Sequence, residues 1–160
     1  MTATDGMLEW NPTYFDAWIG LLQTHRKLTR ELDARLEAEH GLSVSGLELL
    51  VRLNAAPDHR LRLSLLARQT GLSLSRVSRI VDSLESRGLV ERQACPSDAR
   101  AINAQLTEQG EERLHAAELT HRSVVQSSFF DHLSCGEIET LAEVFGRFAP
   151  GAASTCPGGK

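Results

Sequence analysis

Arginine is concentrated in the middle of this chain. Residues 60–105 contain eight arginines and four acidic residues, which gives this segment a charge of +4. The whole chain carries −4, so the remaining residues carry −8. A guanidinium group is planar and can donate two parallel hydrogen bonds, which suits the oxygens of a phosphate and the edge of a guanine base. Because binding to a polyanion depends on local charge, we expect this segment to contact phosphates.

A bias in composition is the alternative explanation. The chain has only two lysines, Lys27 and Lys160, so arginine supplies nearly all of its positive charge. On this explanation, exposed arginines on a helix form only a solvated surface. The two explanations differ in whether the surrounding elements bring the arginines to one face.

One short helix and one longer helix are expected to position these side chains. The first, with Leu63 and Leu66, is closed by Gly71, and Ser73 caps the second, which runs from about Leu74 to Arg87. The apolar face of the second helix is predicted to consist of Leu74, Val77, Ile80 or Val81, and Leu84. Its outward face is predicted to consist of Ser75, Arg76, Ser78, Arg79 and Asp82.

A β-hairpin is predicted to follow this helix. Residues 89–93 and 102–106 have the composition and alternation of strands, and the polar stretch 95–100 lies between them. Arg100 is therefore near the tip, where it suits the negative potential of a DNA minor groove. A helix pair followed by a hairpin is the order of a winged helix-turn-helix, whose second helix enters the major groove.

Long helices are predicted on both sides of this unit. Asn11 and Pro12 begin an amphipathic helix that ends at Gly41 and is about 40 Å long. That length exceeds what a small core can cover, so a partner chain is expected against it. Ser45 and Glu48 are predicted to form a capping box for a helix that stops before Pro57. Thr107 is predicted to cap a helix from Glu108 to about Phe130. Ser134 and Glu137 are predicted to form a capping box for a last helix that ends near Phe148.

Length and composition exclude several classes of protein. A chain of 160 residues with 41% apolar and 24% charged residues is expected to form one globular domain. It has no membrane span and no secretory signal, so a cytoplasmic protein is expected. Cys95, Cys135 and Cys156 are too far apart for a zinc finger or a disulfide framework. The sequence lacks the common catalytic motifs, so neither an enzyme nor a cofactor is expected, and a small helical enzyme remains the alternative from another class.

Three sequence motifs carry a resemblance to a known family. They are Gly88-Leu89-Val90-Glu91-Arg92, Asp98-Ala99-Arg100 and Leu106-Thr107-Glu108-Gln109-Gly110. Together with the helix that precedes them, they resemble the MarR family (multiple antibiotic resistance regulator type) of bacterial transcription factors over about residues 12–148.

The resemblance implies a homodimer that binds a pseudo-palindromic double-stranded DNA operator, usually as a repressor. The implied fold is mainly α with a small β-hairpin wing, a winged helix-turn-helix with an intertwined helical dimerisation region. Residues 12–40 and 108–148 are the expected dimerisation helices and 45–107 the DNA-binding lobe, with flexible ends at 1–11 and 149–160. The implied DNA-binding residues are Ser73, Ser75, Arg76, Ser78, Arg79, Asp98 and Arg100. A winged helix that binds only protein is the alternative.

The resemblance also suggests regulation by a small aromatic or phenolic effector. Trp18, His25 and Arg26 are candidates to bind one, although a place in the dimer core is the favoured explanation for Trp18 and His25. Redox sensing through Cys95 in the hairpin loop is a further alternative.

No metal site is expected. The helix after the hairpin carries His115, Glu118 and His121, with Glu111 one turn earlier. Six residues separate the two histidines, which places them about 240° apart around a helix. Only a site shared across a dimer could then use both. Solvated surface and Glu–His pairs explain these side chains more simply.

The wing aspartate gives the first testable prediction. If Asp98 orients Arg100 or an arginine of the preceding helix, Asp98→Ala weakens DNA binding although it removes a negative charge. Arg100→Ala weakens binding and reduces the salt dependence by about one phosphate contact. Affinities measured at several salt concentrations test both variants. Unchanged or tighter binding by Asp98→Ala contradicts the orienting role.

Overall fold

The computed structural model describes residues 11–95 and 98–148, and at residues 95 and 98–100 it describes the backbone alone. In chain order the elements are α1 (Pro12–His40), α2 (Val44–Ala55), the 3-10 helix η1 (Pro57–His59), β1 (Arg60–Arg62), α3 (Leu63–Thr70), α4 (Leu74–Ser86), β2 (Val90–Cys95), β3 (Asp98–Leu106), α5 (Glu108–Ser128), the 3-10 helix η2 (Phe130–His132) and α6 (Cys135–Phe148). The fold is mainly α with a small antiparallel sheet, as the sequence predicts.

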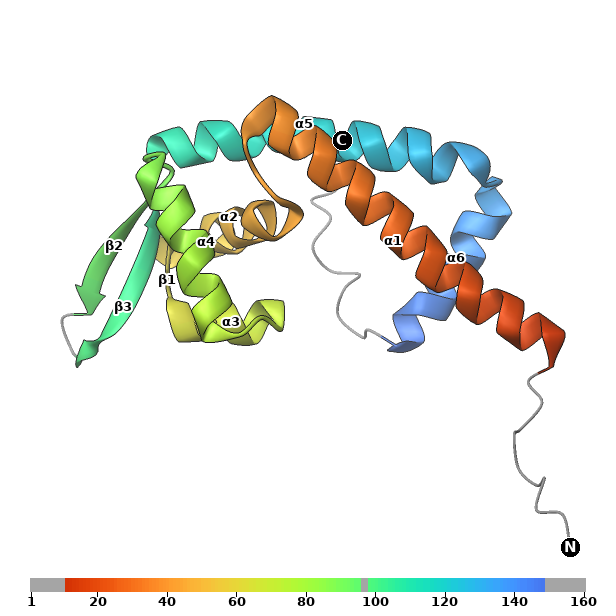
Figure 1. Ribbon diagram of the computed structural model, residues 1–160, viewed down its shortest axis with the longest axis horizontal. Coiled ribbons are helices and arrows are strands. Elements are labelled where there is room, and N and C mark those ends of the chain that lie inside the picture. The colour runs from red at the N-terminus through yellow and green to blue at the C-terminus, as the bar shows by residue number, and fades with distance from the viewer. Residues whose placement is uncertain (1–10, 96–97, 149–160) are drawn as a thin grey trace, which may run out of the picture.

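The molecule has a compact lobe and two long helices (Figure 1). Helices α2, α3 and α4 and the sheet lie beneath one end of α5, and α1 and α5 extend away from them. The core belongs to the lobe: Leu49, Leu50, Leu53 and Leu66 are completely buried there. In α1 only Leu32 and Leu36 are buried. The first half of α1 is therefore uncovered, as expected from its length.

Side-chain caps fix most helix starts where the sequence places them. Asn11 accepts from the amide of Thr13 at 2.9 Å, and Ser73 accepts from that of Arg76 at 3.3 Å. Thr107 accepts from the amide of Gly110 at 3.0 Å. The predicted capping box before α6 is present, because the Ser134 amide donates to the Glu137 carboxylate at 2.8 Å. These polar contacts satisfy amide groups that a helix leaves unpaired at its first turn.

The predicted start of α2 is wrong by two residues. Ser43, not Ser45, caps this helix by accepting from the amide of Gly46 at 3.0 Å. A second amide, that of Val44, donates to Asp33 of α1 at 2.7 Å. Asp33 thus satisfies, from another helix, an amide of the first turn that α2 leaves unpaired. Glu48 instead approaches Arg52 along α2, at 3.5 Å.

The sheet has a strand that the sequence did not predict. The strand order is β1-β3-β2, so β3 is central and pairs antiparallel with both neighbours. Strand β1 has only three residues, and Leu61 lies opposite Ala104. So short a segment has no alternation of its own to detect, and it is a strand because β3 offers it an edge.

The carbonyl end of α1 joins the lobe to the long helices. Arg113 of α5 donates to the His40 carbonyl at 2.6 Å, and Arg87, just after α4, donates to the Gly41 carbonyl. His40 Nε2 lies 2.8 Å from the hydroxyl of Thr120, which donates to Glu39 at 2.9 Å. Since the hydroxyl has one proton and gives it to Glu39, His40 Nε2 is the donor in its own contact. The last turn of α1 is thereby held from α4 and from α5.

Gly110 allows α5 to lie directly on the backbone of Leu89, the residue before strand β2. A Cβ at this position would collide with the carbonyl oxygen of Leu89 and lie 2.7 Å from Leu106 Cδ1. Both neighbours are core residues, buried to 1% and 7% exposure, so neither can move aside freely.

Gly110→Ala is therefore expected to lower the free energy of unfolding by about 2 kcal/mol, because the added methyl overpacks the core. Gly136→Ala is the matched control, since a Cβ there meets no heavy atom within 4 Å. That control should leave stability unchanged or raise it by up to about 1 kcal/mol, because alanine favours a helix. Urea unfolding of both variants is the measurement. Equal stability of the two variants would contradict the close contact.

Candidate nucleic-acid interface

Helix α4 separates a buried face from an arginine-bearing face. Val77 and Val81 are completely buried and Leu84 is 3% exposed, so three successive turns anchor the helix in the core. Ser73, Ser75, Arg76 and Arg79 are exposed. Leu74 was predicted on the buried face and is instead 54% exposed, because it precedes the first turn that contacts the core. The outward face of α4 therefore carries polar and basic side chains and one apolar side chain.

The two arginines of this face are open to a binding partner. The guanidinium groups of Arg76 and Arg79 form no hydrogen bond or ion pair with any residue that the structure describes. Both line a groove of about 470 Å³ that also includes Ser43 and Gly46 at the start of α2. The groove is also lined by Arg87 and by one acid, Glu37, so its three arginines give it a net positive charge suited to phosphate oxygens.

The serines of α4 have different environments. The hydroxyls of Ser73 and Ser75 lie 3.2 Å apart, and Ser73 also caps the helix. Ser78 is half-buried, and its hydroxyl and carbonyl oxygens accept from Arg92 at 2.9 Å and 3.0 Å. Ser75 is therefore the more accessible hydroxyl, whereas Ser78 holds the arginine of the next strand.

Arg92 fastens the wing to α4, a role that sequence reasoning did not assign to it. Its guanidinium is paired with Asp82 and lies 3.8 Å from Glu85, and the Arg92 amide donates to Glu85 at 3.0 Å. Only 23% of its side chain is exposed. This arrangement neutralises the acidic residues of α4, which would otherwise repel a polyanion. No sequence signal identified the pairing, because strand and helix come together only in the folded chain.

The tip of the wing lies partly outside the described residues. Strand β3 begins at Asp98, which pairs with Cys95 after an irregularity in register next to Ala94. The side chains of Cys95, Asp98 and Arg100 are not described, so the roles expected for them stay predictions. Among the described residues, Asp82 and Glu85 of α4 orient Arg92 of the wing.

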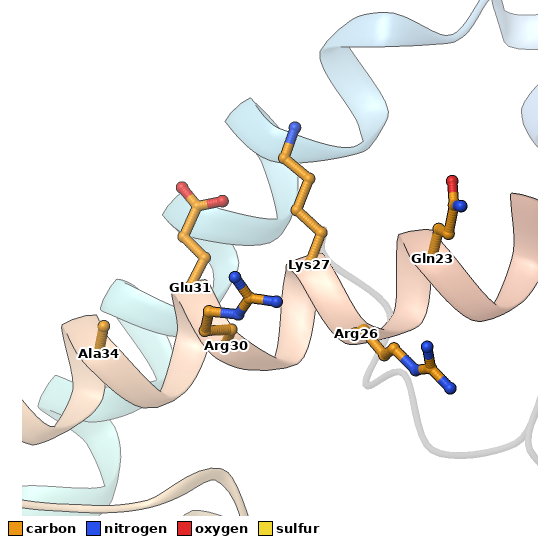
Figure 2. Close-up of a pocket in the computed structure, with 6 residues that line it drawn as sticks. All are labelled: Gln23, Arg26, Lys27, Arg30, Glu31 and Ala34. Carbon is orange, nitrogen blue, oxygen red and sulfur yellow. The ribbon is translucent and has the colours of Figure 1, made fainter.

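The candidate effector residues lie along α1 and do not share one pocket. Trp18 is 47% exposed and His25 is exposed. Arg26 lines an open groove of about 550 Å³, whose other lining residues are Gln23, Lys27, Arg30, Glu31 and Ala34. Figure 2 shows Lys27 and Glu31 extending to one side of the helix and Arg26 to another. This stretch of α1 is a basic surface, and Glu31 on it accepts from Ser128 of α5 at 2.8 Å.

The histidines of α5 do not come together. His115 is exposed, whereas burial lowers the pKa of His121, with Arg122 adding to that shift and Glu118 opposing it. Among residues 11–95 and 98–148, no three His, Cys, Asp or Glu side chains are grouped so as to hold a metal ion. Nor does any helix in those ranges have the length and apolar character needed to cross a membrane.

Comparison with known proteins identifies the family to which this fold belongs. A family model described as MarR family matches residues 40–101. The regulator Sco3205 of Streptomyces coelicolor, whose crystal structure is a complex with DNA, is 32% identical with a TM-score of 0.80, over 89% of this chain and 92% of that one. The chain belongs to the MarR family. AbsC, a MarR family regulator of the same organism, is 33% identical with a TM-score of 0.78, over 88% and 95% of the two chains.

A curated relative matches over a shorter region. The transcriptional repressor MprA of Escherichia coli K12 is 34% identical over 88 residues, 55% of this chain and 49% of its own length. The match thus spans about half of that protein. MarR family membership makes this chain a transcriptional regulator with a winged-helix fold and not an enzyme, in agreement with the sequence-based expectations.

Arg92→Ala is expected to lower both the stability of the lobe and its affinity for DNA. It removes charge-assisted hydrogen bonds, which should lower the free energy of unfolding by about 1–3 kcal/mol. It also leaves Asp82 and Glu85 unpaired beside the arginine face, so DNA affinity should fall even at temperatures where the variant is fully folded. The matched control is Arg147→Ala on α6, whose exposed pair with Glu143 at 2.6 Å should change stability by less than about 0.5 kcal/mol. Urea unfolding and DNA titration measure the two effects. Wild-type affinity in folded Arg92→Ala would contradict the positioning role.

Proposed function

We propose that this chain is a homodimeric repressor that binds a pseudo-palindromic DNA operator. Helix α4 enters the major groove, and the wing formed by β2 and β3 reaches the neighbouring minor groove. The observation that carries this proposal is the pair of unpaired arginines, Arg76 and Arg79, on a helix anchored by its opposite face. The DNA complex of the similar regulator Sco3205 supports the choice of partner.

The proposed contacts divide into base edges and phosphates. Ser75, Arg76 and Arg79 are assigned to the major groove, where serine and arginine reach donors and acceptors on base edges. Ser73 and Ser78 support them, the first as the helix cap and the second through Arg92. Asp98 and Arg100 are assigned to the wing contact. Residues 45–107 form the DNA-binding lobe in this proposal, and the protein acts in the cytoplasm, where its DNA is found.

Exposed apolar side chains on the long helices support the homodimer. Tyr14, Phe15, Trp18 and Leu21 of α1 are between 45% and 70% exposed, and Phe148 of α6 is 83% exposed. So large an apolar surface on a water-soluble regulator marks an interface. A second copy covers it in the proposed dimer, with residues 12–40 and 108–148 as the dimerisation helices. Two lobes related by a two-fold axis then match two operator half-sites.

The protein is also proposed to repress transcription and to be released from DNA by a small molecule. MprA is named a repressor, and so is YetL of Bacillus subtilis, which is 25% identical over 137 residues. A small aromatic acid is proposed as the effector, with its carboxylate at Arg26 in the basic groove of α1. Trp18 and His25 complete the effector site only if the dimer brings them to it. A winged helix that binds only protein, and redox control through Cys95, are the competing functions.

Binding to the DNA upstream of the protein's own gene tests this function. The wild type should bind that fragment more tightly than a scrambled one, with an affinity that falls as salt rises. Arg79→Ala should lose about tenfold in affinity and reduce the salt slope by about one. Arg122→Ala, an exposed arginine on α5 outside the lobe, is the matched control and should bind like the wild type.

Three further measurements test the dimer, the effector site and the role of Cys95 separately. Light scattering should give twice the 17.6 kDa chain mass for the free protein. Added aromatic acid should release the DNA in the wild type and not in Arg26→Ala. Added peroxide should leave binding unchanged if Cys95 is a bystander. Equal, weak binding to both fragments would contradict the operator function and favour a protein partner.

A further inference from the structure

Leu74 is an exposed leucine in the first turn of the helix that carries the arginine face. Full burial would have stabilised the fold, yet 54% of this residue remains open to solvent. Val77, one turn later, is completely buried, so the core ends just short of Leu74. The exposure is thus a feature of this position on α4 and is not shared by the rest of its apolar face.

A cleft beside Leu74 has an apolar base and a polar rim. It has a volume of about 370 Å³ and lies between α3, the start of α4 and strand β3. Leu74 and Ile102, which is 46% exposed, supply its apolar surface. Ser64, Ser78 and Arg62 supply polar lining. Two half-exposed apolar side chains facing one cleft leave a surface that gains free energy when another apolar group covers it.

The position of this cleft limits what can cover it. The first residues of a recognition helix are those that contact base edges in the major groove. A leucine side chain forms no hydrogen bonds, and the one apolar group that a base pair presents in that groove is the C5-methyl of thymine. Leu74 is followed directly along α4 by Ser75 and Arg76, which are also exposed. DNA held by those residues therefore brings a base edge close to Leu74.

We propose that Leu74 is a specificity-determining residue that contacts the methyl group of one thymine in each operator half-site. This inference rests on the proposed function, because it requires α4 to enter the major groove. Arg76 and Arg79 supply affinity through charge and hydrogen bonds, and Leu74 adds selection for thymine over cytosine or uracil at one position. Ile102 borders the same cleft and helps to exclude water from the contact.

Replacing thymine by deoxyuridine tests the contact, since it removes the methyl group and keeps the base pair. Each thymine in a synthetic duplex carrying the bound site is replaced in turn, with the matching position replaced in both half-sites. For the wild type, one position per half-site should lose about fourfold in affinity, the value of one buried methyl group. In Leu74→Ala that position should become insensitive, while the effects at other positions remain. This coupling is the signature of a direct pair contact.

Two further variants make the outcome decisive. Leu74→Met keeps an apolar side chain and should keep the sensitivity to deoxyuridine. Val51→Ala, which truncates a 38% exposed side chain on α2 outside the cleft, should bind every duplex like the wild type. Circular dichroism confirms that each variant is folded.

Two results would overturn the proposal. One is Leu74→Ala with weaker binding but unchanged sensitivity at every thymine, which would assign Leu74 to the sugar-phosphate backbone. The other is Leu74→Ala that binds all duplexes like the wild type. Failure of the wild type to distinguish its site from a scrambled duplex would instead contradict the operator function itself, so the two failures are distinguishable.

Discussion

The end of α1 is the constraint on which the arrangement of the molecule depends. Its last carbonyl groups accept hydrogen bonds from Arg113 of α5 and from Arg87 at the end of α4. Leu36 and Leu42, on either side of this turn, are buried in the core of the lobe. Polar contacts therefore fix the direction of α1 where its apolar contacts begin. They add to the contacts that Asp33 makes with Val44 and that Glu31 makes with Ser128.

Helix α4 divides its structural role and the binding role proposed for it between two faces. Its inner face is part of the core, so its position is set by the packing of the whole lobe. Its acidic residues, Asp82 and Glu85, are engaged by Arg92 of the neighbouring strand. The outward charge of the helix is then that of its arginines alone. The same contact ties the wing to the helix, so α4 and the wing keep one relative orientation.

Local signals predicted most of the fold, and contacts between distant residues account for the rest. Asn11, Ser73, Thr107 and Ser134 mark helix starts because each cap acts within three residues. The start of α2 was misplaced because part of its cap is Asp33, which lies on another helix. Strand β1 was missed for a similar reason, because it forms only by pairing with β3, which is distant in the sequence. At the site, the exposed arginines of α4 could be predicted from periodicity, whereas the pairing of Arg92 could not.

The length of α1 has a mechanical consequence. Its 29 residues form a rod of about 43 Å, whose second half is attached to α5 and the lobe from Glu31 to Gly41. The first part, residues 12–30, is about 28 Å long, so a rotation of about 10° at Glu31 moves its far end by about 5 Å, roughly one seventh of one turn of DNA. Small changes in angle where α1 leaves α5 are thus converted into larger displacements at its N-terminal end. The hydrogen bond from Ser128 to Glu31 contributes to the stiffness of this attachment.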